Sequence, residues 1–329
     1  MPPPLRVLTR GSILVGKHGQ RYVLLDPLVQ RKGKQCNVWS AIKQDNPIHQ
    51  FVLKKPDDED GPGWPDFTQE MEMQKLLYKS GYIRRMVDII PPSPVIGIEP
   101  PIMVLEAFEK SLWTARLRRP FSLGEIRSIM RSIAIGLSTI HHNNMYMPDL
   151  KMENILVNGF DNETPGSGEH LVTKIADLGM MRPPSHGPIS AITYRSPEVY
   201  FKKPWTTATD IWSWGIVYLH LLQAHVNFEE PGIFDSLKVE GTLIDKENTI
   251  RAAMAQEFDL HTIEYYNSDP DTRQLLPPKD ETRTELDHWV VKLINKDIPE
   301  KDIETVHVAL NPVPELRPSA LELLEYGYI

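Results

Sequence analysis

Cysteine is the scarcest informative residue in this sequence, occurring once in 329 residues, at Cys36. A single cysteine excludes a disulfide within the chain and is typical of reducing compartments. Long apolar runs are also missing. The most apolar stretch, 211–222, is well short of the about 20 residues that a membrane-spanning helix needs. The opening Met-Pro-Pro-Pro lacks the apolar core of a secretory signal. We therefore expect a cytoplasmic or nuclear protein with no membrane partner.

An excess of positive charge is absent as well, because 36 Lys and Arg face 44 Asp and Glu. The net charge of −8 argues against a general nucleic-acid-binding protein. The hydrophobic fraction of 41% and charged fraction of 24% are those of an ordinary globular protein. Proline is abundant, with 29 residues that gather where we place loops: 2–4, 91–101, 183–188, 277–278 and 312–318.

The first third of the chain is rich in strand signals. Asp57 to Asp60, before Gly-Pro-Gly, is predicted to be a solvated loop. A helix over 66–79 follows, with Asp66 as its N-cap and an apolar face made by Phe67, Met71, Met73, Leu76 and Leu77. Short β-branched or aromatic runs bounded by turn residues predict strands at 13–15, 22–25, 38–42, 51–53, 86–90 and 102–105.

The rest of the chain is mainly helical in pattern. Ser122 to Glu125 forms a capping box, and apolar residues follow it at helical spacing up to Ile140. The run 210–222 is apolar on nearly every side, which predicts a buried helix. The fold class is therefore α+β, with a small β-rich lobe that has one main helix, and a larger helical lobe. Further helices are expected at 249–257, 285–296, 300–309 and 318–326.

The stretch 146–157 carries the chemistry. It places Asp149 and Lys151 two residues apart and Asn154 three residues later, before an apolar run. Asp177 follows a second apolar run, 171–176, so a β-hairpin would return Asp177 to Asn154. Phosphoryl transfer requires one acid near the reacting hydroxyl and oxygen ligands for a hard cation.

This stretch resembles the catalytic loop of the protein kinases, and Asp177-Leu178-Gly179 resembles their metal-binding triplet. The resemblance implies that Asp149 orients the acceptor hydroxyl and takes its proton, while Lys151 offsets charge on the transferring group. It also implies that Asn154 and Asp177 coordinate Mg²⁺. The form Asp-Leu-Lys-x-x-Asn is that of serine/threonine kinases.

Phe51-Val52-Leu53-Lys54 resembles the kinase Val-Ala-Ile-Lys, whose lysine holds the α- and β-phosphates of ATP. The alternative is an edge-strand lysine with its ammonium in water. The resemblance requires a glutamate on the next helix. Glu70 is preferred to Glu72, because a helix that buries Met73 cannot aim both acids inward.

The nucleotide pocket is implied by register alone. Counting back from Val38, the glycine-rich loop falls on 31–38, where only Gly33 of three glycines is kept and Cys36 takes the third position. We expect Cys36 to be a half-buried residue without reactivity. Glu106-Ala107-Phe108 matches the connector between the kinase lobes. By resemblance, the backbones of Glu106 and Phe108 bond the adenine, and Leu105 backs the pocket.

Three later motifs extend the resemblance to about 22–328. Tyr194 to Glu198 resembles the end of the activation loop, 209–215 the start of the central helix with Asp210, and 314–320 the motif whose Arg317 pairs with Glu198. We therefore expect one protein kinase domain over 1–329, with an N-lobe at 1–106, a C-lobe at 107–329 and the active site in the cleft between them.

Three departures from the family pattern bear on control. Pro148 stands where many kinases have an arginine that pairs with a phosphorylated activation-loop residue, and proline offers neither charge nor donor. Activity is therefore predicted not to depend on activation-loop phosphorylation. Met147 replaces a histidine and cannot make its hydrogen bonds. Ala191 replaces a threonine that bridges the catalytic Asp and Lys, a role that Ser190 or Thr193 could take after a local shift.

These residues predict a monomeric enzyme that transfers the γ-phosphoryl group of ATP, with Mg²⁺, to Ser/Thr hydroxyls of protein substrates. The alternative is a pseudokinase, a nucleotide-binding or protein-binding scaffold with weak or no transfer, which the reduced glycine loop, Met147-Pro148 and Ala191 favour. Transfer to a small molecule is disfavoured, because the Tyr194 to Glu198 segment and the Arg317 motif belong to protein kinases.

Overall fold

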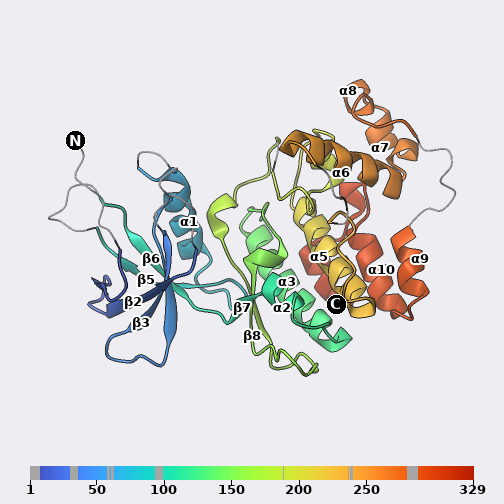
Figure 1. Cartoon of the computed structure of the whole chain (residues 1–329). Coiled ribbons are helices and arrows are strands. Elements are labelled where there is room, and N and C mark those ends of the chain that lie inside the picture. Colours follow the sequence, from blue (N-terminus) through green and yellow to red (C-terminus); the bar gives the residue numbers. More distant parts are fainter. Residues whose placement is uncertain are drawn as a thin grey trace. The chain divides into compact units, whose positions relative to one another are not determined.

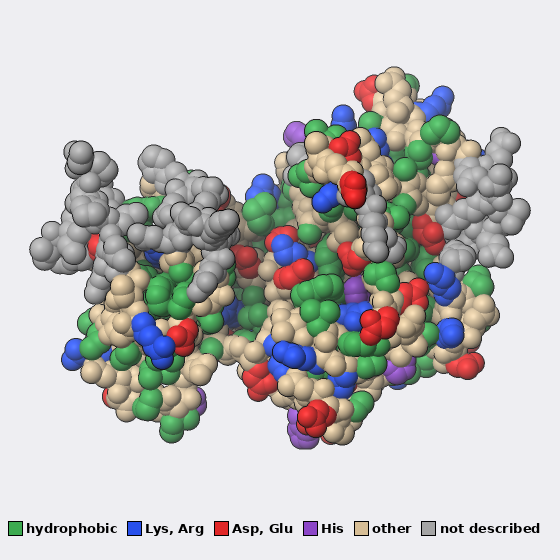
Figure 2. Space-filling model, in the orientation of Figure 1, with side chains coloured by type: hydrophobic (Ala, Val, Ile, Leu, Met, Phe, Trp, Pro, Cys, Tyr) green, Lys and Arg blue, Asp and Glu red, His purple; other side chains and the backbone are tan. Residues whose placement is uncertain are grey.

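The chain forms two compact units (Figure 1). The first comprises Met1–Glu109 with Asp177–Met180, and the second Lys110–Ala176 with Met181–Ile329. On the face seen in Figure 2, acidic and basic side chains are interspersed over both units. The computed structural model describes residues 8–29, 36–57, 60, 63–92, 99–187, 189–235, 237, 240–279 and 288–329.

The first unit is built on an antiparallel sheet of six strands in the order β1-β2-β3-β4-β6-β5. The predicted runs all form strands. Alternate side chains such as Leu14, Leu24 and Leu53 are buried in one core cluster beneath the sheet. The strands are β1 Ile13–Val15, β2 Arg21–Pro27, β3 Val38–Lys43, β4 Gln50–Lys54, β5 Met86–Ile90 and β6 Ile102–Glu106.

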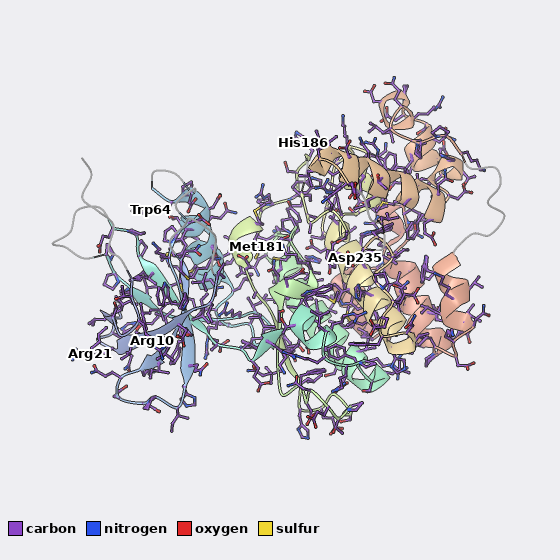
Figure 3. All side chains as sticks on the ribbon, in the orientation of Figure 1. Arg10, Arg21, Trp64, Met181, His186 and Asp235 are labelled. Carbon is purple, nitrogen blue, oxygen red and sulfur yellow. The ribbon has the colours of Figure 1, made fainter. Side chains whose placement is uncertain are left out.

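Helix α1, Pro65–Leu76, is the main helix of this unit, and its cap differs from the prediction. Asp66 lies in the first turn. The residue before the helix is Trp64, in the left-handed conformation and labelled in Figure 3. Asp60 caps the helix instead, since its two carboxylate oxygens accept from the backbone N–H groups of Asp66 (2.9 Å) and Phe67 (3.0 Å). Asp60 lies outside the helices and strands, as predicted, and in addition its carboxylate caps α1.

The buried face of α1 is also rotated from the predicted one. Phe67 and Met71 pack with Val52, Met103 and Leu105, as expected of an apolar face. Leu76, by contrast, is 45% exposed. Glu70 and Gln74 take inward positions instead, because each has a polar partner there: Lys54 for Glu70, and the Met86 N–H for Gln74.

The second unit is helical, with a small antiparallel sheet in the order β7-β8-β9 (Figure 1). Its strands are β7 Lys110–Ser111, β8 Ile155–Asn158 and β9 Val172–Ile175. Its helices are α2 Leu112–Arg116, α3 Leu123–His142, α4 Pro197–Tyr200, α5 Ala208–Val226, α6 Leu243–Glu257, α7 Glu264–Asn267, α8 Pro270–Arg273, α9 His288–Ile294, α10 Glu300–Ala309 and α11 Ala320–Glu325.

Two helix predictions in this unit are confirmed in detail. Ser122 and Glu125 form both bonds of the capping box at the start of α3. Helix α5 is buried along nearly its whole length. Helix α6 begins before the predicted residue 249, because Thr242 and Asp245 form a second capping box that the prediction missed.

The α+β, two-part architecture predicted from the sequence is thus confirmed. Within the described ranges, no helix has the length and apolar character to cross a bilayer. The described residues also include the 3₁₀ turns η1 Met152–Asn154, η2 Leu178–Met180, η3 Leu260–Thr262 and η4 Pro314–Leu316.

Candidate active site

Lys54, Glu70 and Asp177 form a charged cluster within the first unit. Lys54 ends β4, and its Nζ lies 2.7 Å from Glu70 Oε2 on α1 and 3.1 Å from Asp177 Oδ1. Glu72, the competing glutamate, is exposed and pairs with Lys75 instead. Of the two acids considered from the sequence, the structure therefore places Glu70 against Lys54. The edge-strand alternative, with the ammonium in water, does not describe Lys54.

Burial and charge act against each other in this cluster. Burial disfavours the charged form of Lys54, but the negative charges of Glu70 and Asp177 outweigh it and raise the pKa of Lys54. The Glu70 side chain is 5% exposed. Burial raises the pKa of Glu70, and Asp177 adds to the rise, while Lys54 and Arg84 oppose it. Lys54 is thus a firmly charged cation, whereas Glu70 takes up a proton more easily than an ordinary carboxylate.

The cluster faces a pocket of about 320 Å³. Asp177 has a positive φ of 60°, a conformation that non-glycine residues adopt at a cost and that gathers at functional sites. The turn η2 that follows Asp177 packs against α1, which fixes Asp177 beside Glu70. The pocket is lined by Asn37, Lys54, Lys55, Asp57, Asp60, Asp66, Phe67, Glu70, Asp177, Gly179 and Met180.

The residues implied in nucleotide binding lie in the same unit. Gly33, of the predicted glycine-rich loop, lies outside the described residues. Val38 opens β3 and packs against the cluster that contains Leu105. Leu105 is buried in β6, and Phe108, two residues after that strand, is partly buried. Cys36 is partly buried, as the sequence predicts, and its thiol donates to the Val38 carbonyl.

Arg84 is a site residue that sequence reasoning missed. Its Nε donates to the Glu106 carbonyl at 2.8 Å, the acceptor that the resemblance assigns to adenine. It also acts electrostatically on Glu70 and Asp177. No motif marks Arg84, because its contact with Glu106 joins two strand ends that are distant in sequence.

Asp149, Lys151 and Asn154 form a second cluster, within the second unit. Lys151 Nζ lies 2.8 Å from Asp149 Oδ2 and 3.0 Å from Oδ1. The Asn154 amide nitrogen donates to the Asp149 carbonyl (2.9 Å) and to its Oδ2 (2.8 Å). Because the nitrogen of Asn154 is used in this way, its amide oxygen is the atom left to bind a metal ion. An amide oxygen is a kind of ligand that Mg²⁺ accepts.

Asp210 on α5 holds the backbone of this loop. Asp210 is fully buried, and its Oδ2 accepts from the Met147 N–H at 2.7 Å and lies 2.8 Å from His141 Nε2. Burial raises the pKa of Asp210, although His141 and the Met147 N–H both favour the carboxylate. Met147 and Pro148 are themselves buried. The Met147 side chain is therefore part of the core beneath the Asp149 loop, and its backbone N–H is the group that Asp210 holds.

The predicted β-hairpin forms. Strands β8 and β9 pair with Ile155 opposite Ile175, and the Ala176 N–H donates to the Asn154 carbonyl at 2.8 Å. Asp177 is the next residue in the chain.

Two further predictions concern residues after this hairpin. Arg317 makes a bidentate ion pair with Glu198, at 2.8 and 2.7 Å, and both side chains are fully buried. The Ser190 hydroxyl is buried and has no hydrogen-bond partner among the described residues. It does not take over the bridge between Asp149 and Lys151 for which a threonine is missing at Ala191.

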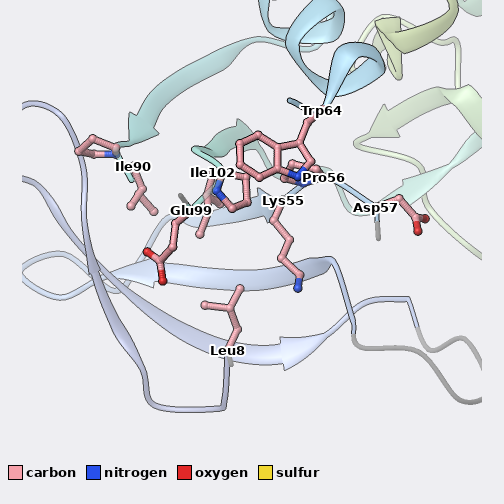
Figure 4. A pocket seen from close by; sticks show the side chains of 10 residues that line it. Leu8, Lys55, Pro56, Asp57, Trp64, Ile90, Glu99 and Ile102 are labelled. Atoms are coloured by element: carbon pink, nitrogen blue, oxygen red, sulfur yellow. The ribbon is translucent and has the colours of Figure 1, made fainter. Parts of the chain in front are cut away.

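A separate pocket of about 270 Å³ lies elsewhere in the first unit, and none of the predicted site residues lines it. Lys55, next to Lys54, is buried there, as is Glu99. In Figure 4 both side chains extend towards Leu8, away from the Trp64 ring. Lys55 lines both pockets, whereas Lys54 lines only the one that contains Glu70 and Asp177.

Comparisons with known proteins identify the family of the chain. The family described as "Protein kinase domain" matches residues 32–329, nearly the whole chain. The chain therefore belongs to the protein kinase domain family.

Individual relatives match less of their own length. Meiosis induction protein kinase IME2/SME1 of Saccharomyces cerevisiae is 33% identical over 172 residues, covering 45% of this chain and 26% of that protein. This chain thus spans about a quarter of that relative.

Two solved structures share the fold. One is the yeast RNA Pol II CTD kinase CTDK-1 complex, with a TM-score of 0.70 and 18% identity over 98% of this chain and 95% of that chain. The other is the CAK complex from Chaetomium thermophilum bound to ATP-γ-S, with a TM-score of 0.69 and 18% identity over 93% and 90%.

Proposed function

We propose that this protein transfers the γ-phosphoryl group of ATP, with Mg²⁺, to serine or threonine hydroxyls of protein substrates. The observation that carries the proposal is the cluster of Lys54, Glu70 and Asp177. Three charged side chains from a strand, a helix and a distant segment meet around one ammonium. Membership in the protein kinase domain family supports the same function.

Each residue has a distinct role in the proposed reaction. Lys54, held by Glu70, presents its charge to the α- and β-phosphates of ATP. Asp149 orients the acceptor hydroxyl and takes its proton, and Lys151, 2.8 Å from Asp149, places a cation where charge develops. Mg²⁺ would neutralise charge on the phosphates, and Asn154 and Asp177 are the residues that would hold it.

The test uses the purified full chain with labelled ATP, Mg²⁺ and generic protein substrates. Asp149→Asn and Asp177→Ala remove the proposed base and metal ligand and are expected to abolish transfer. Asp297→Asn is the matched control, because Asp297 is an exposed aspartate that lines neither cluster. Transfer that survives in both site variants would refute the proposal.

Independence from activation-loop phosphorylation is the second part of the proposal. Pro148 replaces the arginine that would bind a phosphate, and it is buried. Protein treated with a phosphatase is expected to turn over as fast as untreated protein. A large loss of activity on dephosphorylation, reversed by rephosphorylation, would contradict this.

A scaffold without transfer is the second candidate function. The Ser190 hydroxyl favours it, because this hydroxyl has no hydrogen-bond partner among the described residues and does not bridge Asp149 and Lys151. Thermal stabilisation by ATP with Mg²⁺, without transfer, would support a nucleotide-binding scaffold over the enzyme. A cytoplasmic or nuclear location and a monomeric state remain predictions, which fluorescence microscopy and light scattering would check.

A further inference from the structure

The segment Ile189 to Tyr194, just before Glu198, is anchored through its carbonyl groups. The carbonyls of Ile189 and Ser190 accept from the Arg195 guanidinium, at 2.7 and 3.1 Å. Three later carbonyls of the segment also accept hydrogen bonds. The Ala191 carbonyl accepts from the Tyr194 N–H, the Ile192 carbonyl from the Tyr200 hydroxyl, and the Tyr194 carbonyl from the Ser213 hydroxyl. The segment is thus held by donors that belong to the chain itself.

Arg195 is the centre of this arrangement. It is 8% exposed, and its guanidinium lies 5.0 Å from the centre of the Tyr200 ring. Its remaining nitrogen, Nη1, lies 2.7 Å from Glu247 Oε1 on α6. Every nitrogen of the guanidinium thus has a partner, which fixes the plane in which it presents Nε and Nη2 to the segment.

The segment needs such an anchor because Ser190 is strained. Its φ of +68° lies in the left-handed region, which costs a non-glycine residue of the order of 1–3 kcal/mol. Its hydroxyl is buried and finds no partner among the described residues, which adds to the cost. Surrounding contacts must hold this conformation, and the charge-assisted bond from Arg195 to the Ser190 carbonyl is one of them.

The same segment reaches the loop that carries Asp149. Burial raises the pKa of the Tyr194 hydroxyl, and the backbone of Met152, in the turn η1 that follows Asp149, lies close enough to oppose that rise. A displacement of Ile189 to Tyr194 would therefore be transmitted to that turn.

We propose that Glu247 is a positioning residue for protein phosphorylation. It orients Arg195, and Arg195 holds Ile189 to Tyr194 in the conformation that receives the substrate beside Asp149. The inference rests on the proposed function and assigns the permanent Glu247–Arg195 pair the ordering role for which other kinases use a phosphorylated residue.

The kinetic test compares Glu247→Gln, which keeps the shape and removes the charge, with Glu247→Asp, which keeps the charge. Glu247→Gln is expected to raise KM for a protein substrate about tenfold, the effect of one lost charge-assisted hydrogen bond, and to leave KM for ATP within about twofold. Glu247→Asp should recover most of the loss. Glu264→Gln is the control, because Glu264 is exposed and the substitution changes the charge equally.

A purely structural role would lower kcat by reducing the folded fraction, with both KM values unchanged, and that outcome would overturn the inference. Parent protein without transfer to any substrate would instead refute the proposed function.

Hydrogen exchange distinguishes failure of this inference from failure of the proposed function, because the measurement does not require activity. Amides of 189–195 are expected to exchange at least tenfold faster in Glu247→Gln than in the parent, with α10 unchanged. Equal exchange in the two proteins would overturn the inference even if the protein proves to be inactive.

Discussion

At the scale of single residues, burial and neighbouring charges set the protonation states of the side chains in the site. Lys54 and Glu70 are both withdrawn from water, and Asp177 adds a second acid to one base. The sum favours a charged lysine and a glutamate that binds a proton readily. The strand pattern predicted that Lys54 ends β4, but nothing in the spacing of charges showed this proton balance, because it depends on burial.

This balance predicts an acid limb in the pH profile. As pH falls through the raised pKa of Glu70, Lys54 loses one of its two acidic partners, and kcat/KM for ATP is expected to fall. Glu70→Gln should be at least tenfold less active at neutral pH, since the buried Lys54 loses a charge-assisted bond, and should lack this limb. Steady-state rates between pH 5 and 8 would check this.

The control concerns stability. A carboxyl whose pKa is raised on folding binds more protons in the folded state than in the unfolded one, so its protonation stabilises the fold. The acid limb should therefore appear while the protein is still folded by circular dichroism. Loss of activity that coincides with unfolding would contradict the assignment to Glu70.

At the scale of elements, α1 shows why its N-cap was predicted at the wrong residue. The pattern placed the N-cap at Asp66, but the cap comes from Asp60, which precedes the helix by a loop. The rules for N-caps consider the residue adjoining the first turn. A carboxylate that reaches back from a preceding loop satisfies the same N–H groups and leaves no local signal.

Asp60→Ala is expected to destabilise the first unit by about 1 kcal/mol, because it removes two hydrogen bonds and a favourable charge at the helix N-terminus. Asp66→Ala removes a nearby charge without those bonds and should cost about half as much or less. Urea unfolding of both variants measures the difference. A larger effect for Asp66→Ala would restore the original prediction and reject the role of Asp60.

At the scale of the whole molecule, the Glu198–Arg317 pair joins the end of the activation segment to the last helices. Thr209 donates to Glu198, while the Asn311 and Ala208 carbonyls accept from Arg317. Burial alone would raise the pKa of Glu198, but Arg317 outweighs it and the pKa is lowered. All the donors and acceptors of the pair are therefore engaged.

Removing one partner leaves a buried charge without compensation, so Glu198→Gln is expected to cost about 3–5 kcal/mol of unfolding free energy at neutral pH. Since the folded pKa is lowered, the carboxylate stabilises the fold above about pH 4.5 and loses that effect as pH falls through the folded value. Thermal unfolding from pH 3 to 7 should show the two proteins converging in acid.

Glu72→Gln is the control for this experiment, because it breaks an exposed pair with Lys75. Its expected cost is below about 1 kcal/mol. A similar loss in both variants, or a difference that does not change with pH, would contradict the role of the buried pair.

The sequence by itself determined the α+β class, the six strands of the first unit and the long helices of the second. These follow from apolar periodicity and local caps, which act within a few residues. It also determined the loop of Asp149, Lys151 and Asn154, whose members are close in sequence.

Only the tertiary structure decided that Glu70 faces Lys54, that Asp60 caps α1, that Arg84 bonds the Glu106 carbonyl and that Glu247 orients Arg195. Each of these contacts joins segments that come together only when the core packs. Burial then sets the strength of the electrostatic interactions between their charged groups.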